Sequence, residues 1–423
     1  MAPVSGTDRG TDGAVRRQYE ELPYPARDPA DEAKRLVTGS PSHLLEIEHY
    51  VFAGHRAGPL RALIAGGGTG DGAIMLAQQL ADRGEGEVVY LDISGAALAI
   101  ARARAEARGL ANIVFHQGSL LAIDMLDLGR FDYIDCCGVL HHLADPLEGV
   151  LALAEALTED GGMGLMLYGE LGRTGVYPLQ RALRRLTGGE ELPERLGLAR
   201  LLLDGLPESN WFRRNPFLGD HLAGDDAGLF DLLLHARDRA YTVDEIARLC
   251  RQAGLRPTGF VPPLAYAPAT YLEDPELRAR AARLPPLEAA ALAEELAGSL
   301  KSHVFYVVRD GNDGGGAAVP GGGLVPVLRD GNAAGLSRAL SRSPVLRVNQ
   351  DGLALRFELP KAAGELVRLI DGNRSLDAVF DALAGRNPRL SRAAFDALFA
   401  EVYGVLNPLN MLLFGGPGAP QRP

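Results

Sequence analysis

Two adjacent histidines are the residues of this chain best suited to moving a proton. His141 and His142 stand in the stretch 138–143, which reads G-V-L-H-H-L. Imidazole titrates near neutral pH, so one of them can act as a general base toward a hydroxyl or ammonium group. The alternative is that the pair starts a helix as scaffolding or contacts a cofactor. A catalytic role therefore depends on what else the fold brings to this place.

A glycine-rich stretch, residues 62–72, has the pattern of a nucleotide-binding turn. It reads A-L-I-A-G-G-G-T-G-D-G, in which an apolar run fits a buried strand and leads into a helix over residues 71–80. Gly66, Gly68 and Gly70 have no Cβ, so they can take positive φ and let a flat ligand lie against the backbone. Strand, turn and helix predict a ligand corner at the carboxyl edge of a parallel sheet, with a plain tight turn as the alternative.

The residue after this turn, Asp71, bears on the kind of ligand. A dinucleotide-binding pattern, G-x-G-x-x-G, has glycine at this place, and a carboxylate there would repel a pyrophosphate. A cationic or zwitterionic ligand fits better, which favours S-adenosylmethionine with its sulfonium and amino groups. Asp92 lies 22 residues after Gly70, at the end of a second apolar run, and can accept both hydroxyls of an adenosine ribose.

Strand-like and helix-like segments alternate along the middle of the chain. After the second apolar run, Ser94 is a suitable N-cap for an alanine-rich helix over residues 95–108. Further strand-like runs cover residues 112–116, 131–137, 164–168, 254–261 and 303–308, and a D-G-G turn at 160–162 precedes the third of them. This alternation predicts an α/β fold, in which a parallel sheet has helices on both faces.

Residues 60–170 resemble the class I S-adenosylmethionine-dependent methyltransferases, motif by motif and in the family's order. A-G-G-G-T-G matches the glycine-rich first motif, Y-L-D-I-S the second, and F-D-Y-I-D-C-C-G-V-L-H-H-L the fourth. The resemblance implies a Rossmann-like, seven-stranded, mostly parallel sheet with an antiparallel seventh strand, and S-adenosyl-L-methionine as cofactor. It also implies cofactor contacts from Ala65, Gly66, Gly68, Gly70, Asp71, Asp92, Ile93, Gly118, Ser119 and Cys137. The residues themselves predict a mostly helical insert over about 171–245.

Two positions depart from the pattern of that family. The first motif usually has an acidic residue just before or within its glycines, which reaches the methionine amino group; Ala65 does not supply one, whereas Asp71 can. The third motif usually has aspartate after glycine to hold the adenine amino group. Here the pair is Gly118-Ser119, whose hydroxyl is a weaker acceptor.

Candidate contacts for the methyl acceptor come from segments around the end of the fourth strand. They are Tyr24, Glu170, Arg173, His235 and Tyr241. The stiff segment 21–25, E-L-P-Y-P, is predicted to fold over the cofactor as a lid, with Tyr19 or Tyr24 against the sulfonium. The alternatives are that these tyrosines only pack onto the sheet, that Glu170 pairs with Arg173, and that the remaining residues form a buried polar network. An N/D-P-P-Y/F motif does not follow the fourth strand, so amide and base nitrogens are not expected as acceptors.

Composition limits the possible partners and location. The chain has 423 residues, enough for two or three domains, and its net charge of −11 disfavours nucleic-acid binding, which needs a basic surface. No apolar run approaches the roughly 20 residues of a membrane span, and the N-terminus does not have the pattern of a signal peptide. Three cysteines cannot form a disulfide framework or a zinc site, so we expect no metal and a cytoplasmic location.

Four parts are predicted along the chain. They are residues 1–58, a tail (disordered over 1–12) with a helical prelude; residues 59–309, the methyltransferase-like domain; residues 310–342, a flexible glycine-rich linker; and residues 343–415, an accessory α+β domain. The accessory domain resembles small winged-helix modules, with two strand-like runs and three helices, two of them capped by Ser375 and Ser391. Contact with another protein, dimerisation and a purely structural cap are the roles left open for it.

The sequence thus predicts an S-adenosylmethionine-dependent methyltransferase whose acceptor is a small molecule, a protein or a peptide. Two alternatives stay open, a methyltransferase-like scaffold that binds a partner without catalysis and an NAD-dependent oxidoreductase. Ser119 and the acid missing near Ala65 favour the first alternative, and the glycine spacing favours the second.

Overall fold

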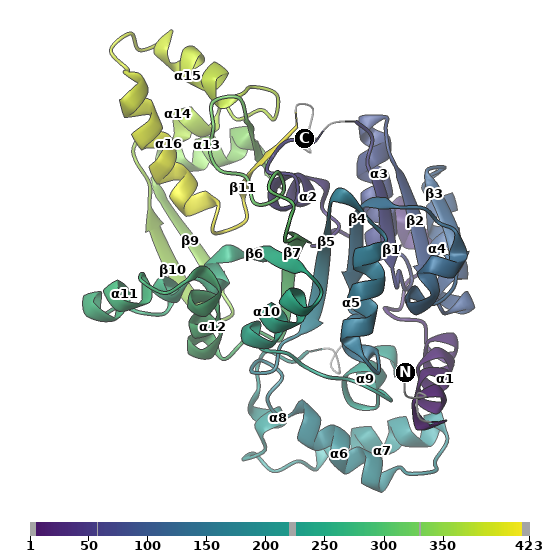
Figure 1. Cartoon of the computed structure of the whole chain (residues 1–423). Coiled ribbons are helices and arrows are strands. Elements are labelled where there is room, and N and C mark those ends of the chain that lie inside the picture. Colours follow the sequence, from purple (N-terminus) through teal and green to yellow (C-terminus); the bar gives the residue numbers. More distant parts are fainter. Residues whose placement is uncertain (1–5, 57, 220–225, 330, 417–423) are drawn as a thin grey trace.

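A seven-stranded sheet lies at the centre of the computed structural model, which describes residues 6–56, 58–219, 226–329 and 331–416 (Figure 1). Its order is β3-β2-β1-β4-β5-β7-β6. The strands are β1 (Arg61–Ala65), β2 (Glu87–Asp92), β3 (Ile113–Gln117), β4 (Phe131–Cys137), β5 (Leu157–Tyr168), β6 (Leu255–Val261) and β7 (Ser302–Arg309). β7 is antiparallel to both neighbours and the other neighbouring pairs are parallel, which confirms the predicted sheet.

Helices cover both faces of this sheet, as predicted for a Rossmann-like fold. One face is covered by α5 (Pro146–Glu155), α10 (Val243–Gln252) and α12 (Pro286–Ala297), and the other by α2 (Leu44–Tyr50), α3 (Asp71–Arg83) and α4 (Gly95–Ala107). Ser94 caps α4 as expected and accepts a hydrogen bond from the Ala97 N–H at 3.1 Å. The loops that follow the parallel strands therefore gather at one edge of the sheet. Among the described residues, no helix combines the length and the apolar character needed to cross a membrane.

Strand β5 begins earlier than predicted, because the D-G-G stretch at residues 160–162 is not a turn. The pairing of β5 with β4 shifts register just before Tyr133, which lies opposite Gly162, so the preceding residues bulge within the strand. The glycine is needed for close packing instead. A Cβ on Gly162 would come within 2.6 Å of Val51 Cγ1 and 2.7 Å of the Val307 carbonyl oxygen.

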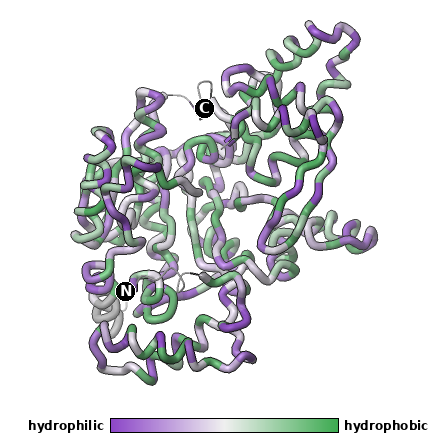
Figure 2. The backbone as a smooth tube through the Cα atoms, turned by 180° about the vertical axis from the view of Figure 1, so that it is seen from behind, coloured by the Kyte–Doolittle hydropathy of each residue, from purple (hydrophilic) through white to green (hydrophobic). Residues whose placement is uncertain are grey.

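Between β5 and β6 the chain forms the predicted helical insert, which has an apolar core of its own. Its helices before α10 are α6 (Val176–Leu186), α7 (Leu192–Asp204), α8 (Trp211–Arg214) and α9 (Asp226–Leu233). Apolar side chains of all four pack together. Hydrophilic and hydrophobic residues alternate along these helices in Figure 2, as expected of amphipathic helices over a small core. The helices between β6 and β7, α11 (Pro275–Ala281) and α12, were not predicted.

The N-terminal segment is helical closer to its start than the sequence predicted. Helix α1 (Gly6–Glu21) includes residues 6–12, which were expected to be disordered, and residues 1–5 lie outside the described part. The carboxylate of Glu20 anchors the end of this helix, because it accepts hydrogen bonds from the N–H groups of Gly95 and Ala96 at 2.8 and 3.0 Å. This anchor is a tertiary contact, which composition does not reveal.

The segment predicted as a flexible linker is instead folded onto the domain. The backbone of Gly316 exchanges hydrogen bonds with Ala53 and Val51, both at 2.9 Å, and the Ala318 N–H donates to the His49 carbonyl at 2.7 Å. Glycine-rich composition predicts flexibility, but backbone hydrogen bonds need no side chain and fix this segment against the end of α2.

The accessory domain begins before residue 343, because the former linker contributes two elements to it. The elements are β8 (Val325–Leu328), α13 (Ala333–Arg342), β9 (Val345–Gln350), β10 (Leu353–Glu358), α14 (Ala363–Val367), α15 (Leu376–Ala384), α16 (Arg392–Leu406) and β11 (Leu412–Gly415). β8 pairs with β11 and β9 with β10, both antiparallel. The two strand-like runs, the three helices after them and the caps Ser375 and Ser391 agree with the sequence analysis, while the winged-helix resemblance stays a prediction.

A buried carboxylate joins the accessory domain to the sheet domain. Glu46 of α2 accepts hydrogen bonds from Tyr306 of β7 and from Asn410, both at 2.6 Å, and pairs with Arg329. The Tyr50 hydroxyl donates to Asn410 at 3.0 Å. These polar groups are satisfied only when both domains are in place, so the network fixes their relative position.

Candidate functional site

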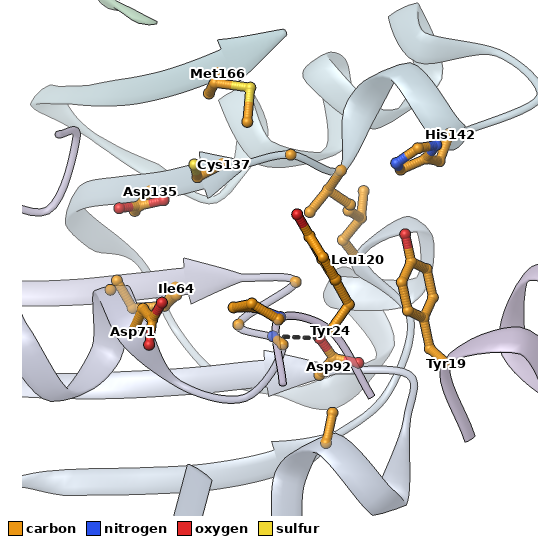
Figure 3. Close-up of a pocket in the computed structure, with 18 of the residues that line it drawn as sticks. Tyr19, Tyr24, Ile64, Asp71, Asp92, Leu120, Asp135, Cys137, His142 and Met166 are labelled. Atoms are coloured by element: carbon orange, nitrogen blue, oxygen red, sulfur yellow. Dashed lines mark hydrogen bonds between the residues drawn. The ribbon is translucent and has the colours of Figure 1, made fainter. Parts of the chain in front are cut away.

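A cavity of about 980 Å³ lies at the carboxyl ends of β1, β2 and β4 (Figure 3). Predicted cofactor and acceptor residues that line it are Gly66, Gly68, Asp71, Asp92, Ile93, Gly118, Ser119, Cys137, Tyr24, His142 and Arg173. Predicted residues outside its lining are Ala65, Gly70, His141, Glu170, His235 and Tyr241. The sequence motifs, which are scattered over more than a hundred residues, therefore converge on one space.

The glycine turn after β1 has the left-handed backbone that the sequence predicted. Gly66, Gly68 and Gly70 have φ of 79°, 51° and 103°. A Cβ on Gly66 would lie 2.3 Å from Val139 Cγ2, and one on Gly70 would lie 2.8 Å from the Ala101 Cβ. Gly66 thus exposes bare backbone beside β4, whereas Gly70 lets α3 approach α4.

Asp92 at the end of β2 is held beside the glycine turn. Its two carboxylate oxygens accept hydrogen bonds from the N–H groups of Gly68 and Ser94, each at 2.8 Å, and the first appears as a dashed line in Figure 3. Burial raises the pKa of Asp92, against the lowering effect of these backbone donors. Each oxygen keeps a further lone pair, so the carboxylate can still accept the two ribose hydroxyls that the resemblance implies.

Apolar side chains beside Gly118 and Ser119 suit the flat face of an adenine. They belong to Ile93, Leu120 and Leu121, which line the cavity there. The Ser119 hydroxyl oxygen caps a short 3₁₀ helix and accepts a hydrogen bond from the Leu121 N–H at 3.2 Å. One lone pair and the hydroxyl proton remain, so Ser119 can contact an adenine without replacing the missing aspartate in full.

Asp71 has partners that the sequence did not reveal. Its carboxylate accepts hydrogen bonds from Arg27 Nη2 at 2.6 Å and from Arg104 Nη1 at 2.7 Å. Burial acts to raise the pKa of this carboxyl, but the two guanidinium groups outweigh it and the pKa is lowered. These partners argue against two expectations. Asp71 is already neutralised, so it is not free to hold a methionine amino group or to repel a pyrophosphate.

The segment before α2 contributes to the lining of the cavity, and its action as a lid stays a prediction. The Thr69 hydroxyl in the glycine turn donates to the Pro25 carbonyl at 2.7 Å, and the Ser94 hydroxyl donates to the Tyr19 carbonyl at 3.0 Å. Tyr19 and Tyr24 both line the cavity. The tyrosines thus pack against the sheet domain and face the ligand space at once, so the two interpretations of this segment are compatible.

At the other end of the cavity, His142 joins two tyrosines and a carboxylate. The hydroxyls of Tyr168 and Tyr19 donate to the two carboxylate oxygens of Asp231, at 2.7 and 3.3 Å. The Tyr19 hydroxyl points toward the ring of His142 in Figure 3, and the two ring centroids are 6.4 Å apart. Burial raises the pKa of Asp231 and of both phenols, so the tyrosines stay protonated and act as donors.

The backbone of Arg237 holds two stacked histidines in opposite tautomers. Its carbonyl accepts a hydrogen bond from His142 Nδ1 at 2.8 Å, so Nδ1 carries the proton and Nε2 has the free lone pair. The Arg237 N–H donates to His235 Nδ1 at 3.0 Å, which leaves the His235 proton on Nε2, 3.2 Å from the Tyr19 hydroxyl. His142 therefore lines the cavity with a nitrogen that can accept a proton, and His235 supports it from outside the lining.

His141 does not share this position. Its ring is fully buried, stacks on Tyr168 with centroids 3.9 Å apart, and has no hydrogen-bond partner on either nitrogen. Burial holds the pKa of His141 well below its usual value, so the ring stays neutral. Of the two histidines predicted as bases, the geometry favours His142.

The remaining residues that were predicted to contact the methyl acceptor lie in different places in the structure. Arg173 pairs with Asp238 at 3.1 Å, not with Glu170, and its guanidinium lies 3.7 Å above the ring of Tyr168. Glu170 is exposed, and Tyr241 is buried in the apolar core of the sheet domain. Arg173 therefore supports the wall of the cavity, while the other two residues do not reach it.

Within the described part of the chain, one group of side chains brings potential metal ligands close together. It consists of His142, Asp231 and His235. Their ligand atoms lie within 4.8 Å of one another. The two imidazole rings are stacked at 3.8 Å with planes only 20° apart, so their in-plane lone pairs lie in two separate, nearly parallel planes, which is unsuited to binding one ion. Both Nδ1 atoms and the carboxylate are already hydrogen-bonded. The arrangement is that of a hydrogen-bond network.

Two buried carboxylates of the cavity wall, Asp135 and Asp231, were missed by sequence reasoning. Asp135 stands within the apolar strand β4, and Asp231 within the apolar helix α9. A charged residue inside an apolar run is a recognisable signal, because burying a carboxylate is costly unless it has a task or a partner.

The central part of the chain is similar to known methyltransferase domains. Residues 63–163 match the family model of a methyltransferase domain. An uncharacterized protein of Synechococcus sp. is 33% identical over 258 residues, which cover 58% of this chain and 59% of that protein. A ubiquinone biosynthesis O-methyltransferase of Acinetobacter baylyi is 30% identical over 93 residues, which cover 22% of this chain and 38% of that protein. The matches thus span less than two thirds of the length of either relative.

Solved structures of PKMT2 from Rickettsia typhi share the fold. One, in complex with AdoHcy, has a TM-score of 0.57 at 12% identity and covers 84% of this chain and 71% of that chain. The other has a TM-score of 0.58 at 13% identity and covers 98% of this chain and 77% of that chain. Identity this low shows the fold alone, but the aligned region extends well beyond the seven-stranded sheet.

Proposed function

We propose that the whole chain methylates an amine of a small molecule or a protein side chain. Residues 63–163 match the family model of a methyltransferase domain, and the sheet has the order of the class I fold, so both support S-adenosylmethionine as cofactor. The observation that carries this proposal is the continuity of the cavity. It joins the glycine turn and Asp92 at one end to His142 and Asp231 at the other. The first end suits an adenosine, and the second has the groups needed to hold and deprotonate an acceptor.

The charge at the acceptor end favours an amine. Asp231 brings a buried carboxylate to the wall, and the rings of Tyr19 and Tyr168 stand beside it. A carboxylate and aromatic rings attract an ammonium group and disfavour an anionic acceptor. The guanidinium of Arg173 does not offset this preference, since Asp238 neutralises it.

An ammonium group must lose a proton before its nitrogen can attack a methyl group. His142 Nε2 can take that proton, because the Arg237 carbonyl fixes the tautomer in which this nitrogen has the lone pair. Asp231 then lies close enough to stabilise the imidazolium that forms. The bound cofactor supplies a methyl group on a sulfonium centre. The main tasks left to the protein are to align the acceptor and to exclude water, for which the segment with Tyr19 and Tyr24 is placed.

Cofactor choice is tested with S-adenosylhomocysteine and NAD as ligands of the purified full chain. At about 100 times its Kd, S-adenosylhomocysteine should stabilise the folded protein by about 2.7 kcal/mol and raise the melting temperature, whereas NAD should not. Stabilisation by NAD alone would end the proposal.

Acceptor chemistry is tested by transfer of labelled methyl groups to amines, hydroxyl compounds and lysate proteins, with products identified by mass spectrometry. We expect N-methylated products. Asp231→Asn should raise KM for an amine acceptor, and Glu288→Gln, which removes an exposed carboxylate of α12, serves as the matched control. O-methylated products alone would overturn the amine assignment, and tight S-adenosylhomocysteine binding without any transfer would favour the non-catalytic scaffold.

A further inference from the structure

The acid that reaches the methionine amino group is missing from its usual place in this chain. Strand β1 reads R-A-L-I-A, with no acidic residue before the glycine turn. Asp71 does not replace it, because Arg27 and Arg104 already occupy its carboxylate. A carboxylate for that amino group must therefore come from another element.

Asp135 of β4 lies at the right place on the neighbouring strand. It is the register partner of Ile64, the second residue before Gly66, and the side chains of register partners in adjacent strands project to the same face of the sheet about 5 Å apart. Ile64 and Asp135 both line the cavity. Figure 3 shows them on adjacent strands at the same side of that space.

The carboxylate of Asp135 has a hydrogen-bond donor but no cation. The Ser42 hydroxyl donates to it, the nearby backbone N–H of Cys137 acts to lower its pKa, and the residue is only 1% exposed. No arginine, lysine or histidine of the described residues forms an ion pair with it, in contrast to Asp71. Its other register partner, Gly164 of β5, brings no charge either. A buried carboxylate that faces a ligand cavity without a cation is suited to receive one from the ligand.

We propose that Asp135 binds the α-ammonium group at the amino-acid end of S-adenosylmethionine, in place of the acid that β1 lacks. This inference rests on the proposed function, since it concerns the same cofactor. It assigns the amino-acid end of the cofactor to the part of the cavity between β1, β4 and the start of α3. A Cβ on Gly72 in the first turn of α3 would lie 3.5 Å from Asp135 Oδ2, so the N-terminus of that helix faces the carboxylate as well.

Two ligands that differ in the amino-acid end provide the test. S-adenosylhomocysteine has the α-ammonium group, whereas 5′-methylthioadenosine has the same adenosine and thioether without the amino acid. Asp135→Asn should weaken binding of S-adenosylhomocysteine at least tenfold in titration calorimetry near pH 8 and change binding of 5′-methylthioadenosine less than twofold. Binding of the second ligand also reports that the cavity of the variant is folded.

The matched comparison is Asp71→Asn, which removes a carboxylate that the arginines already hold. If this variant, and not Asp135→Asn, shows the selective loss of S-adenosylhomocysteine, the inference is wrong. An equal loss of both ligands in Asp135→Asn overturns it too. Failure of the wild type to bind either ligand would instead count against the proposed function.

The pH dependence of the wild type tests the inference without a variant. Burial raises the pKa of Asp135 to about 7, so the carboxylate must be ionised before it can pair with an ammonium group. Affinity for S-adenosylhomocysteine should fall about tenfold per pH unit below about pH 7, while affinity for 5′-methylthioadenosine stays constant.

The titratable neighbours do not change charge in this range. Tyr133, Cys136 and Cys137 on β4 have raised pKa values and stay neutral, and Asp71 at the start of α3 has a lowered pKa and stays ionised. Equal pH profiles for the two ligands would therefore refute the role of Asp135.

Discussion

Replacing Asp135 by asparagine should change how the stability of the ligand-free protein depends on pH. Burial raises the pKa of this carboxyl from 3.8 to about 7. Between those values the folded state keeps a proton that the unfolded chain has released, so the free energy of unfolding falls as the pH rises. Asparagine does not titrate, so the variant lacks this slope.

The two pKa values of Asp135 set the size of the effect. Relative to the variant, the wild type should lose roughly 3 kcal/mol of unfolding free energy between about pH 5 and about pH 8. For a chain of 423 residues that unfolds as one unit, this corresponds to a change of roughly 3 °C in the difference between the two melting temperatures. The other titrating groups are common to both proteins and cancel in the comparison.

Scanning calorimetry of both proteins across this pH range measures the difference, with Asp71→Asn as the control. The folded pKa of Asp71 is lowered, so the stabilisation from its charged form is fully present above about pH 4 and is lost only as the pH falls further. Asp71→Asn should therefore be less stable than the wild type by a constant amount from pH 5 to pH 8. A flat difference for Asp135→Asn, within about 0.5 kcal/mol, would show that Asp135 is ionised in the free protein across this range and would refute the raised pKa.

Three further substitutions test the site. His142→Gln should lower kcat about 100-fold or more, because Nε2 is assigned to proton transfer. The Kd for S-adenosylhomocysteine should stay within about twofold in titration calorimetry. A loss of affinity as large as the loss of kcat would make His142 a cofactor contact. Gly66→Ala should abolish binding of that ligand, since φ is 79° and the new Cβ would lie 2.3 Å from Val139 Cγ2, and circular dichroism checks that the variant folds. Arg27→Ala should release the segment over the cavity, seen as faster cleavage near the N-terminus in limited proteolysis; an unchanged cleavage rate would show that Arg27 does not hold that segment.

The parts of the fold that the sequence predicts well are those encoded over short stretches. Apolar runs gave the seven strands, and the N-caps Ser94, Ser375 and Ser391 lie where local chemistry placed them. Composition was less reliable. The glycine-rich segment near Gly316 reads as a flexible linker, yet its backbone hydrogen bonds to the end of α2 fix it, and such bonds leave no mark in the residue types.

The site shows the same division between local motifs and tertiary contacts. The glycine turn and Asp92 follow from a motif, whereas the partners of Asp71 lie 44 and 33 residues away, at Arg27 and Arg104. The acceptor end is assembled over still longer separations, since Asp231 is 212 residues from Tyr19. Electrostatic roles depend on which charges meet in space, so the sequence could identify Asp71 as unusual but could not show that it was already paired.

We assign different roles to Asp71 and Asp135, the two acids near the glycine turn. Asp71 shares its charge with Arg27 from the covering segment and Arg104 from α4, so it holds structure together and has little to gain from a further cation. Asp135 is buried without a cation, which destabilises the free protein once the carboxyl ionises. A ligand ammonium group removes that cost on binding, so the energy that lowers stability in the free protein raises affinity for the ligand. The two effects must therefore change together. The stability of Asp135→Asn relative to the wild type should be higher near pH 8 than near pH 5. Near pH 8 the variant should also bind S-adenosylhomocysteine more weakly than the wild type does. Neither change alone is consistent with the assigned role.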